Sequence, residues 1–481
     1  MTLRTGEQYK EGQAKIKHNL YINGNKAENL EDNPNTKTVL DANVKVFDLG
    51  LEPQYDETMN TMSPLIGEKV SRNVHPSHSA KDLEMRAEMA VLTSQKLGTC
   101  NYRCPGCDAM HATASATYEM DQKLDTEYHK RFIEWLKYIQ KNDLAVSGGV
   151  MDVKGPRDLR PGKGDPDHYL RIAEKRPDGI VLRGARMHQS GAYAADETLL
   201  VPGVAPRPGE EPYAVACVVK NSQEGITYIA QYNAMSAERE FMGDNSKLGN
   251  PIYGQRETCM IVFDNVFVPW ERVFMCGETE YAHEILLRFA KQHRMACGGS
   301  CKAGFMDLII GATQILIEYL GLDRAPMIRQ EITEMIRVRE ISYGLAIAAA
   351  YRGEEEPKGS GFYLPNDAFG NAAKLNTCDG FWEVMKWAGD IAGGFAVTMP
   401  SEKELENPVT KPLVEKYLKT HASAKDRMRM TRFLQNWIAG LHGVGTWHGA
   451  GPRQNQMIML YRDTDLEKKK QMAKVLAGLK D

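Results

Sequence analysis

The chain has 481 residues, enough for two or three domains or one large helical subunit, and its 42% hydrophobic and 26% charged residues exclude a largely disordered protein. Sixty Lys and Arg against 63 Asp and Glu give a net charge of −3, so no overall field draws the chain to nucleic acid or to an anionic membrane. The N-terminus has no apolar run behind its charges, and no stretch approaches the ~18 uninterrupted apolar residues of a membrane span, so we expect a cytoplasmic protein.

Residues 1–143 are predicted to form a helical domain. Ser79 with Asp82 three residues later is typical of a capping box at the start of a helix. The apolar positions expected on one helical face are Leu83, Ala87, Ala90 and Val91 in that helix and Phe132, Trp135, Leu136 and Ile139 in a later one. This domain should therefore consist of amphipathic helices around a common core.

Between residues 144 and 272 the pattern changes to short β-rich runs. These runs are 179–183, 214–220, 225–232 and 260–268, and Gly, Pro and Asn turns separate them. Residues 273–481 return to helical periodicity, most clearly at 306–319, 327–351 and 375–391. The predicted fold is therefore mainly helical with a central β domain: an N-terminal helical domain, a barrel-like middle β domain and a C-terminal helical bundle.

Three of the nine cysteines, Cys100, Cys104 and Cys107, lie close together in the segment TCNYRCPGCDAMHA. Spacings of four and three place thiols one turn apart on a helix or tight loop, within reach of a single iron-sulfur cluster. A buried structural role is the alternative, and the clustering of three thiols disfavours it. The spacing also matches the radical adenosylmethionine signature, but that motif follows a strand and has an aromatic before its last Cys, where Gly106 stands here.

A second segment, KQHRMACGGSCKAG, places His293, Cys297 and Cys301 at successive steps of four, which is one face of a helix. A His among cluster ligands raises the reduction potential, because imidazole is neutral where a thiolate is charged, and it can leave its iron open to substrate. We favour ligation over a structural role because two thiols accompany the imidazole. Gly298 and Gly299 weaken helix propensity here and predict a local bulge or a close approach of the backbone to a bulky group.

Six further segments give the chain a family resemblance. They are YHKRFIEWLKYIQKNDL, DPDHYLRIAEKRPDGIVLRGARMHQSGA, LGNPIYGQRE, VFDNVFVPWERVF, DIAGGFAVTMPSE and HGAGPRQNQ. With them, nearly the whole chain resembles the 4-hydroxybutyryl-CoA dehydratase family, iron-sulfur flavoproteins related to the two-component 4-hydroxyphenylacetate hydroxylases and, in fold, to acyl-CoA dehydrogenases. The resemblance implies a 4Fe-4S cluster held by three Cys and one His, with FAD beside it, in a homotetramer.

The cluster ligands implied by the resemblance are Cys100, Cys104, His293 and Cys301. Cys301 is assigned because Lys302 and Gly304 follow it as in the family. The family has one residue fewer between the His and the last Cys, so Cys297 stays an alternative fourth ligand. The role of Cys107 stays open.

For FAD, the resemblance points to polar loops beside the β domain, since a flavin needs polar contacts and no reactive chemistry from the protein. The candidate flavin-binding residues are Lys154, His188, Gln189, Ser190, Gly393 and Gly394. The last two match the place where acyl-CoA dehydrogenase-like tetramers bring a neighbouring subunit to the flavin adenosine. Glu257 matches an acidic residue of the family and is a catalytic candidate, against the alternative of a solvated turn residue.

The implied activity is elimination of water from 4-hydroxybutyryl-CoA, or a related hydroxyacyl-CoA, to an enoyl-CoA through a flavin-mediated radical, with vinylacetyl-CoA isomerisation at the same site. His293 is expected to serve as base or as exchangeable iron ligand. The family's Tyr in the His293 segment and its Glu before His448 are absent, so the acyl chain stays open. The alternatives are a reduced-flavin-dependent aromatic hydroxylase, which needs no clustered Cys, and a non-enzymatic cluster-bearing redox protein, which needs no FAD.

Overall fold

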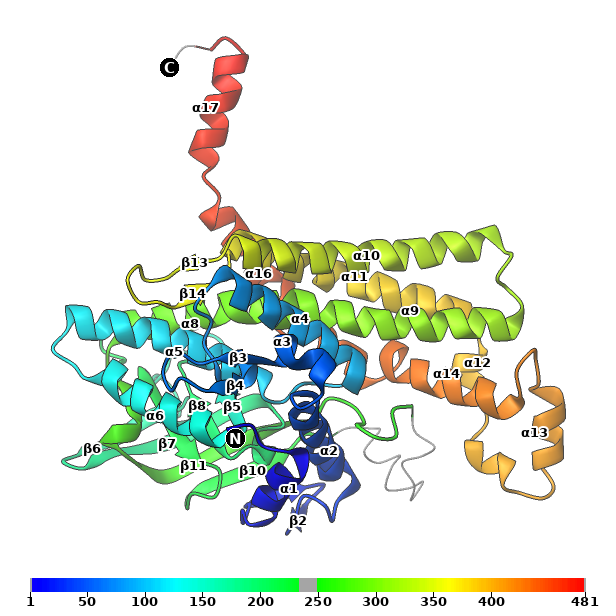
Figure 1. Ribbon diagram of the computed structural model, residues 1–481, viewed down its shortest axis with the longest axis horizontal. Helices are drawn as coiled ribbons and strands as arrows, with labels where there is room; N and C mark the ends of the chain where they lie inside the picture. The colour runs from blue at the N-terminus through cyan, green and yellow to red at the C-terminus, as the bar shows by residue number, and fades with distance from the viewer. Residues whose placement is uncertain (1, 233–248, 480–481) are drawn as a thin grey trace.

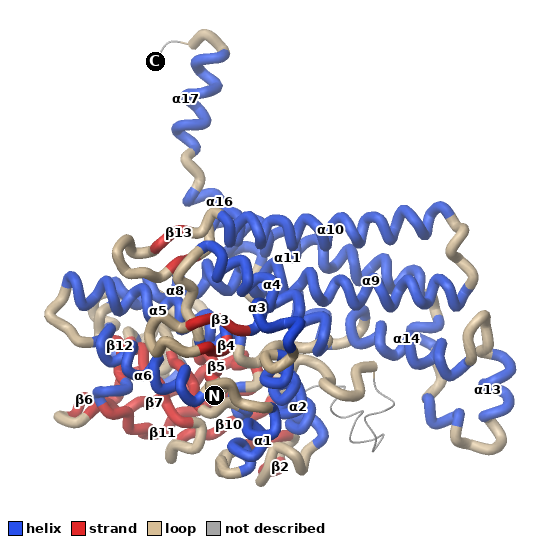
Figure 2. The backbone as a smooth tube through the Cα atoms, in the orientation of Figure 1, coloured by secondary structure: helices blue, strands red, loops and turns tan. Residues whose placement is uncertain are grey.

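The computed structural model describes residues 2–232 and 249–479, and it separates strands from long helices (Figure 1). Figure 2 shows most of the strands gathered at one side of the molecule. The long helices α9 (Cys301–Leu320), α10 (Pro326–Tyr351) and α11 (Asp367–Ala392) run alongside one another at the other side. The predicted order of helices, sheet and helices along the chain is confirmed.

The N-terminal helices follow the apolar periodicity of the sequence. Helix α4 (Ala80–Leu97) begins after Ser79, whose side chain accepts a hydrogen bond from the Asp82 backbone N–H, and it ends at Gly98 in the left-handed conformation. The predicted apolar faces of α4 and of α6 (Tyr128–Asn142) are buried. The other helices before the sheets are α1 (Gly6–Ala14), α2 (Pro34–Leu49), α3 (Asp56–Met59) and α5 (Cys104–Lys123).

Two sheets form the middle of the chain, with strand orders β2-β1-β10-β11-β7-β6 and β12-β9-β8-β5. Their strands are β1 (Leu20–Ile22), β2 (Asn25–Ala27), β5 (Val146–Gly149), β6 (Arg171–Arg176), β7 (Gly179–Ser190), β8 (Glu197–Leu200), β9 (Val215–Lys220), β10 (Ile226–Ala230), β11 (Thr258–Pro269) and β12 (Val273–Cys276). Two small pairs, β3 (Asn60–Met62) with β4 (Lys69–Ser71) and β13 (Glu354–Glu355) with β14 (Tyr363–Leu364), lie outside them. The four predicted β runs fall in β7, β9, β10 and β11.

The sheets differ from the sequence prediction in two respects. Both strand orders are linear, and the pairings of the described strands do not show the expected barrel-like closure. An isolated bridge between Asp152 and Arg186 links the chain after β5 to β7 of the other sheet. Helix α5 packs against β5, the last strand in the order of the four-stranded sheet. In addition, β1 pairs in parallel with β10, so the N-terminal segment contributes strands to the six-stranded sheet.

Helix α8 (Thr279–His293), a π-helical turn (Arg294–Ser300) and α9 make one continuous helix, Thr279–Leu320. By length and composition alone this helix is apolar enough to cross a membrane, and half of its most apolar window is buried inside the molecule. It packs against α4, α10 and α11 and is the central helix of the C-terminal region. The helices after α11 are α12 (Phe395–Thr398), α13 (Lys411–Tyr417), α14 (Ala424–Ile438), α15 (Leu441–His448), α16 (Arg453–Asp463) and α17 (Leu466–Leu476).

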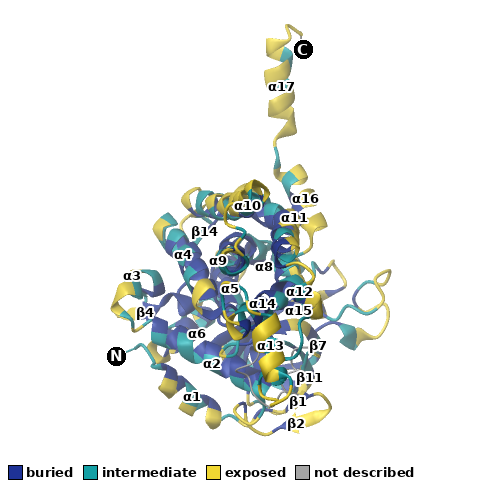
Figure 3. Cartoon of the chain, turned by 90° about the vertical axis from the view of Figure 1, so that its right-hand side faces the viewer, coloured by how far each residue is buried: buried dark blue, intermediate teal, exposed yellow. Residues whose placement is uncertain are grey.

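Helix α17 stands away from the rest of the molecule (Figure 3). None of its residues is buried, and it exposes the apolar side chains of Met472, Val475 and Leu476. Within the described residues of this chain, nothing covers that apolar face.

Candidate functional site

The two thiol segments of the sequence meet in the interior, where α5 packs against α8. The His293 Nδ1 lies 2.7 Å from Oδ2 of Asp108, and the Cys104 Sγ lies 3.7 Å from the same carboxylate oxygen. One potential ligand atom from each of these three residues lies within 4.8 Å of the other two. Residues almost two hundred positions apart in the sequence thus form one group that is able to hold a metal.

The position of Cys104 follows from how α5 begins. Cys104 is the first residue of α5, and Gly106 follows it in the first turn. A Cβ at Gly106 would lie 2.1 Å from the carbonyl oxygen of Val146 in β5, so only glycine permits this approach of the helix to the sheet. The close packing fixes the direction in which the first turn of α5 presents its thiol.

The second segment contains the predicted bulge, which is the π-helical turn Arg294–Ser300. His293 ends α8 just before the turn, and Cys301 begins α9 just after it. At Gly299 a Cβ would lie 2.8 Å from the Cβ of Ala346 and 3.1 Å from that of Ala373, so the turn passes close to α10 and α11. The prediction of a close backbone approach is confirmed, and the bulky group is the pair of packed helices.

Cys297, inside the π-helical turn, is the most strongly activated thiol of the group. The Lys302 Nζ donates a hydrogen bond to its Sγ at 3.0 Å. A hydrogen bond from Cys301, together with the charges of Lys302 and His293, holds the pKa of Cys297 well below its usual range, whereas the same bond raises the pKa of Cys301. Burial disfavours the charged imidazole of His293, but the Cys297 thiolate and the Asp108 carboxylate raise its pKa well above the ordinary value.

The remaining two clustered thiols are Cys100 and Cys107, and burial raises the pKa of both. Burial raises the pKa of Cys100 to about 12, and this thiol also interacts electrostatically with Cys297 and Cys104. The Cys107 thiol donates to the carbonyl oxygen of Arg72 at 3.3 Å, and burial raises its pKa to about 12. Cys107 is therefore held by a backbone acceptor, although it also interacts electrostatically with Cys104 and Asp108. The four implied ligands and Cys297 are likewise electrostatically connected to one another.

A buried lysine lies beside the π-helical turn. Lys374 of α11 is fully buried, and its Nζ donates to the carbonyl oxygen of Trp447 at 2.6 Å. Burial lowers its pKa to about 8, helped by the neighbouring ammonium of Lys302. Lys374 therefore ties the C-terminal helix α15 to the helices that carry the thiols.

Two of the candidate flavin residues lie at the end of β7, where they bind protein groups. The Gln189 Oε1 accepts from the Val150 backbone N–H at 3.2 Å, and Ser190 Oγ accepts from Arg256 Nη2 at 3.1 Å. Arg256 also donates to the carbonyl oxygen of Gly445 at 2.8 Å, and its charge acts on Cys100. Arg256 thus connects the predicted flavin segment with the thiol group.

Lys154 and His188 lie next to this strand end, in unusual backbone conformations. Their φ angles are 75° and 65°, the left-handed region that few non-glycine residues adopt. Burial lowers the pKa of both side chains, and the charge of Lys154 acts on His188. Strained backbone of this kind clusters at ligand-binding sites, so it supports a binding role for this loop pair.

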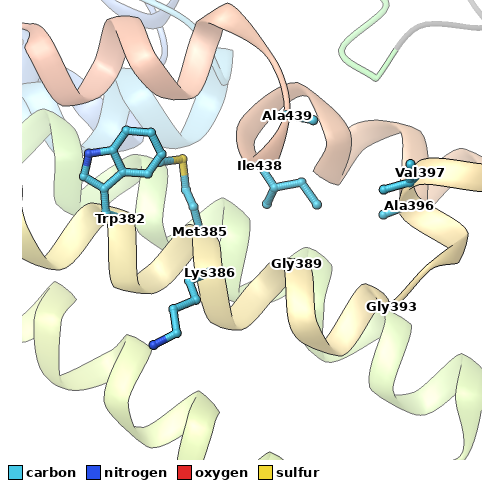
Figure 4. A pocket seen from close by; sticks show the side chains of 9 residues that line it. All are labelled: Trp382, Met385, Lys386, Gly389, Gly393, Ala396, Val397, Ile438 and Ala439. Carbon is cyan, nitrogen blue, oxygen red and sulfur yellow. The ribbon is translucent and has the colours of Figure 1, made fainter.

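Gly393 and Gly394 lie elsewhere, at the exposed end of α11. Gly393 lines a shallow apolar pocket of about 370 Å³ (Figure 4). The other lining residues are Trp382, Met385, Lys386, Gly389, Ala396, Val397, Ile438 and Ala439. None of the other candidate flavin residues lines this pocket, so the described residues of one chain do not bring the glycine pair to the rest of the predicted flavin site.

Glu257 is buried at the start of β11, so it is not a solvated turn residue. Its backbone N–H donates to the hydroxyl of Tyr102 at 3.2 Å, and its carbonyl accepts from the Gly191 N–H at 3.0 Å. Tyr102 lies between Cys100 and Cys104 in the sequence, so this contact holds Glu257 beside the first thiol segment.

Four residues of the site were not predicted as functional: Arg86, Asp108, Arg256 and Lys302. Asp108 follows Cys104 by one helical turn and Arg256 precedes Glu257, so proximity to a predicted residue was the available signal for those two. Arg86 has no such signal, because it lies within a helix whose charged residues are expected to face solvent.

The fold belongs to a known class. Models of the 4-hydroxyphenylacetate 3-hydroxylase N-terminal and C-terminal regions match residues 5–275 and 282–478. A solved oxygenase component of 4-hydroxyphenylacetate 3-monooxygenase, complexed with FAD, superimposes with a TM-score of 0.84 over 98% of each chain at 23% identity, which shows the fold alone. The protein thus has the 4-hydroxyphenylacetate 3-hydroxylase fold.

Two other proteins are more similar to this chain than the hydroxylase is, and they identify its family within this fold class. The 4-hydroxybutyryl-CoA dehydratase/vinylacetyl-CoA-Delta-isomerase of Clostridium aminobutyricum is 38% identical over 99% of this chain and 100% of its own length. An oxygen-tolerant archaeal 4-hydroxybutyryl-CoA dehydratase from N. maritimus superimposes with a TM-score of 0.96 at 33% identity, covering 100% of this chain and 96% of that one. The chain belongs to the 4-hydroxybutyryl-CoA dehydratase family, and the predicted family is confirmed.

Proposed function

We propose that this protein dehydrates 4-hydroxybutyryl-CoA, or a closely related hydroxyacyl-CoA, to an enoyl-CoA and isomerises vinylacetyl-CoA at the same site. The observation that carries the proposal is the buried meeting of His293 with the thiols of both segments, in a chain 38% identical to a dehydratase of that activity. An aromatic hydroxylase of this fold has no use for such a thiol group.

The group fits a 4Fe-4S cluster held by Cys100, Cys104, His293 and Cys301. Thiolate and imidazole are the donors that iron-sulfur clusters take in proteins. Arg86 beside Cys104 offers a further sign of fit, because its Nε and Nη1 are buried and have no hydrogen-bond partner among the described residues. Cys297 is the alternative to Cys301, since both thiols interact with each other and with Lys302.

FAD would lie against the end of β7, where Lys154, His188, Gln189 and Ser190 come together. When bound, the flavin would supply reversible one-electron oxidation of the acyl group, and the cluster iron would supply a Lewis acid for the departing hydroxyl. The apolar pocket at Gly393 and the uncovered face of α17 are surfaces that a homotetramer would use, with Gly393 and Gly394 reaching the flavin of a neighbouring subunit.

Proton transfer and stabilisation of negative charge would fall to side chains of this chain. Asp108 holds Nδ1 of His293, which leaves Nε2 to bind iron or to take a substrate proton, but not both at once. Glu257, buried beside Tyr102, is the second candidate for proton transfer. Arg256 and Lys302 place fixed positive charge between the flavin segment and the thiols, where an acyl thioester oxygen would gain negative charge.

The test is anaerobic purification followed by cofactor analysis and assay on one preparation. We expect about four iron and four sulfide per chain, by the stoichiometry of a 4Fe-4S cluster, together with FAD. With 4-hydroxybutyryl-CoA the protein should form crotonyl-CoA, and a panel of hydroxyacyl-CoA thioesters gives the acyl preference. Zinc or no metal would overturn the cluster proposal. Hydroxylation of 4-hydroxyphenylacetate with reduced flavin and oxygen, without dehydration, would favour the hydroxylase alternative.

A further inference from the structure

Behind the thiol group lies an ion pair, Arg86 with Asp108, which is withdrawn from solvent. The exposed fractions of the two side chains are 2% and 0%. An isolated buried ion pair is weak evidence for stability, because the cost of removing both charges from water offsets their attraction. Two other buried pairs, Arg103 with Asp143 and Arg186 with Asp152, use backbone carbonyls as further acceptors. The Arg86 pair also uses a backbone carbonyl, but it differs from the other two in that its guanidinium donates to a cysteine sulfur.

Arg86 places its guanidinium on the thiol group. Its Nη2 donates to the Cys104 Sγ at 3.0 Å, to the Cys104 carbonyl oxygen at 3.3 Å and to Asp108 Oδ1 at 3.0 Å. The Nε and Nη1 of the same side chain are buried without a partner among the described residues. A buried guanidinium with unused donors beside a cysteine sulfur lacks acceptors, and further sulfur atoms next to Cys104 would supply them.

Asp108 divides its two carboxylate oxygens between Arg86 and His293. Oδ1 accepts from Arg86, and Oδ2 lies 2.7 Å from the His293 Nδ1. A carboxylate that accepts the Nδ1 proton of a histidine fixes the ring and its tautomer, so that Nε2 is the nitrogen offered to a metal. Because α5 supplies both Cys104 and Asp108, one helix positions a thiol ligand and orients the imidazole ligand.

We propose that Arg86 and Asp108 are positioning residues of the cluster: Asp108 orients His293 toward iron, and Arg86 sets the reduction potential through hydrogen bonds and positive charge at the Cys104 sulfur. This inference rests on the proposed function, since it requires the cluster. Positive charge and N–H donors at sulfur raise a cluster potential, and a nearby carboxylate lowers it. The two residues therefore act in opposite directions on the potential while their pair stays neutral.

The test compares Arg86→Met, Arg86→Lys and Asp108→Asn, purified anaerobically as the whole protein. We measure iron and sulfide content, the midpoint potential, release of iron to a chelator, and the nitrogen hyperfine coupling of the reduced cluster. Arg86→Met should lower the potential, Arg86→Lys should restore most of it, and Asp108→Asn should raise it. Asp108→Asn should also weaken the coupling to the His293 nitrogen and release iron 10- to 100-fold more readily, as is typical when the partner of a ligating histidine is lost.

The matched control is Glu197→Gln, which alters a buried carboxylate paired with Arg272 and Trp135 away from the thiols. It should lower the melting temperature and leave potential, coupling and iron release unchanged. If the Arg86 and Asp108 variants behave like this control, the proposal is wrong. Should Arg86→Met fail to fold, Arg86→Gln keeps N–H donors without the charge, and a wild-type potential in that variant would also overturn the proposal. Absence of iron and sulfide from the wild-type protein would instead contradict the proposed function itself.

Discussion

The thiol group and the predicted flavin residues differ in how much of each site one chain assembles. The ligand atoms of Cys104, Asp108 and His293 lie within 4.8 Å of one another in the interior. The flavin candidates are spread from the end of β7 to the exposed Gly393 and Gly394. A cluster needs a few atoms on rigid, packed helices, whereas a large cofactor takes many weak polar contacts over a long surface. The group of Cys104, Asp108 and His293 is thus formed within one chain, whereas we propose that the flavin site needs a neighbouring subunit.

The largest expected effect is loss of the cluster without loss of the flavin. Cys301→Ala should remove most of the iron and sulfide and abolish dehydration, because a cluster ligand is missing, while FAD content stays at the wild-type level. Cys297→Ala is the control within the same π-helical turn and should largely keep the cluster. The reverse result would transfer the ligand role to Cys297, and joint loss of FAD would contradict the separation of the two sites.

His293→Cys should keep a cluster, since thiolate is the commoner ligand, yet lower its potential and remove the base. Dehydration should fall by roughly 10² to 10⁴, the range typical of losing general acid-base catalysis. Iron content, FAD content and turnover are measured on one preparation. Near-wild-type turnover in fully loaded protein would rule out the proposed role of His293.

The next effect in size is a pH dependence of stability that arises from Lys374, the buried lysine beside the thiol group. The pKa of Lys374 is lowered to about 8, so above that pH the folded protein has released a proton that the unfolded chain keeps up to its ordinary pKa near 10.5. Because the unfolded state then binds more protons, stability rises with pH in this window. Relative to Lys374→Met, the wild type should gain about 1.6 kcal/mol in unfolding free energy between about pH 8 and pH 9.5.

Denaturant unfolding of both proteins across that pH range measures this gain, and the difference between them cancels the other titrating groups. Lys386→Met is the control, since Lys386 is an exposed lysine on the same helix. It should show no such slope. A flat difference for Lys374→Met would mean that its ammonium is stabilised in place by the surrounding thiolates.

The smallest expected effect lies in the flavin region. Ser190→Ala removes the acceptor of Arg256 at 3.1 Å and one polar group of the predicted flavin surface. Loss of one such hydrogen bond, worth about 1 kcal/mol, should weaken FAD binding roughly fivefold and leave iron content unchanged. Flavin titration of the variant measures this, with the exposed Ser222→Ala as the control. A loss of iron in Ser190→Ala would contradict the independence of the thiol group and the predicted flavin region.

The elements predicted correctly from the sequence are those with a clear apolar periodicity or with residues of distinct backbone preference. The long helices α9, α10 and α11 and the bulge at Gly298 and Gly299 were predicted, because apolar spacing and paired glycines have direct structural meaning. The strands β1 and β2 were missed, since three-residue strands are too short to show alternation. The strand pairings do not show the expected barrel-like closure of the β domain, because pairing between distant segments leaves no trace in local pattern.

Within the site, the thiols were identified by spacing and resemblance, and their charged partners were not. Arg86 lies in an amphipathic helix, and only tertiary packing decides that its guanidinium is buried against a cysteine instead of solvated. Cys107 shows the converse. Its spacing from Cys104 is the spacing expected of a cluster ligand, but its place on α5 directs its thiol to the Arg72 carbonyl oxygen.

The π-helical turn makes chain length, as well as residue identity, critical between His293 and Cys301. A π turn holds one more residue than an α-helical turn in a continuous helix, so deleting one residue from 294–300 would allow regular α-helix to form there. Each residue of an α-helix advances by about 100°, so His293 would rotate away from the thiols while every side chain of the site was still present. Helix α8 resists such rotation, because Arg288 bonds Ser115 and Glu119 on α5. A one-residue length change here therefore requires a compensating change elsewhere in the site, whereas a substitution within the turn does not.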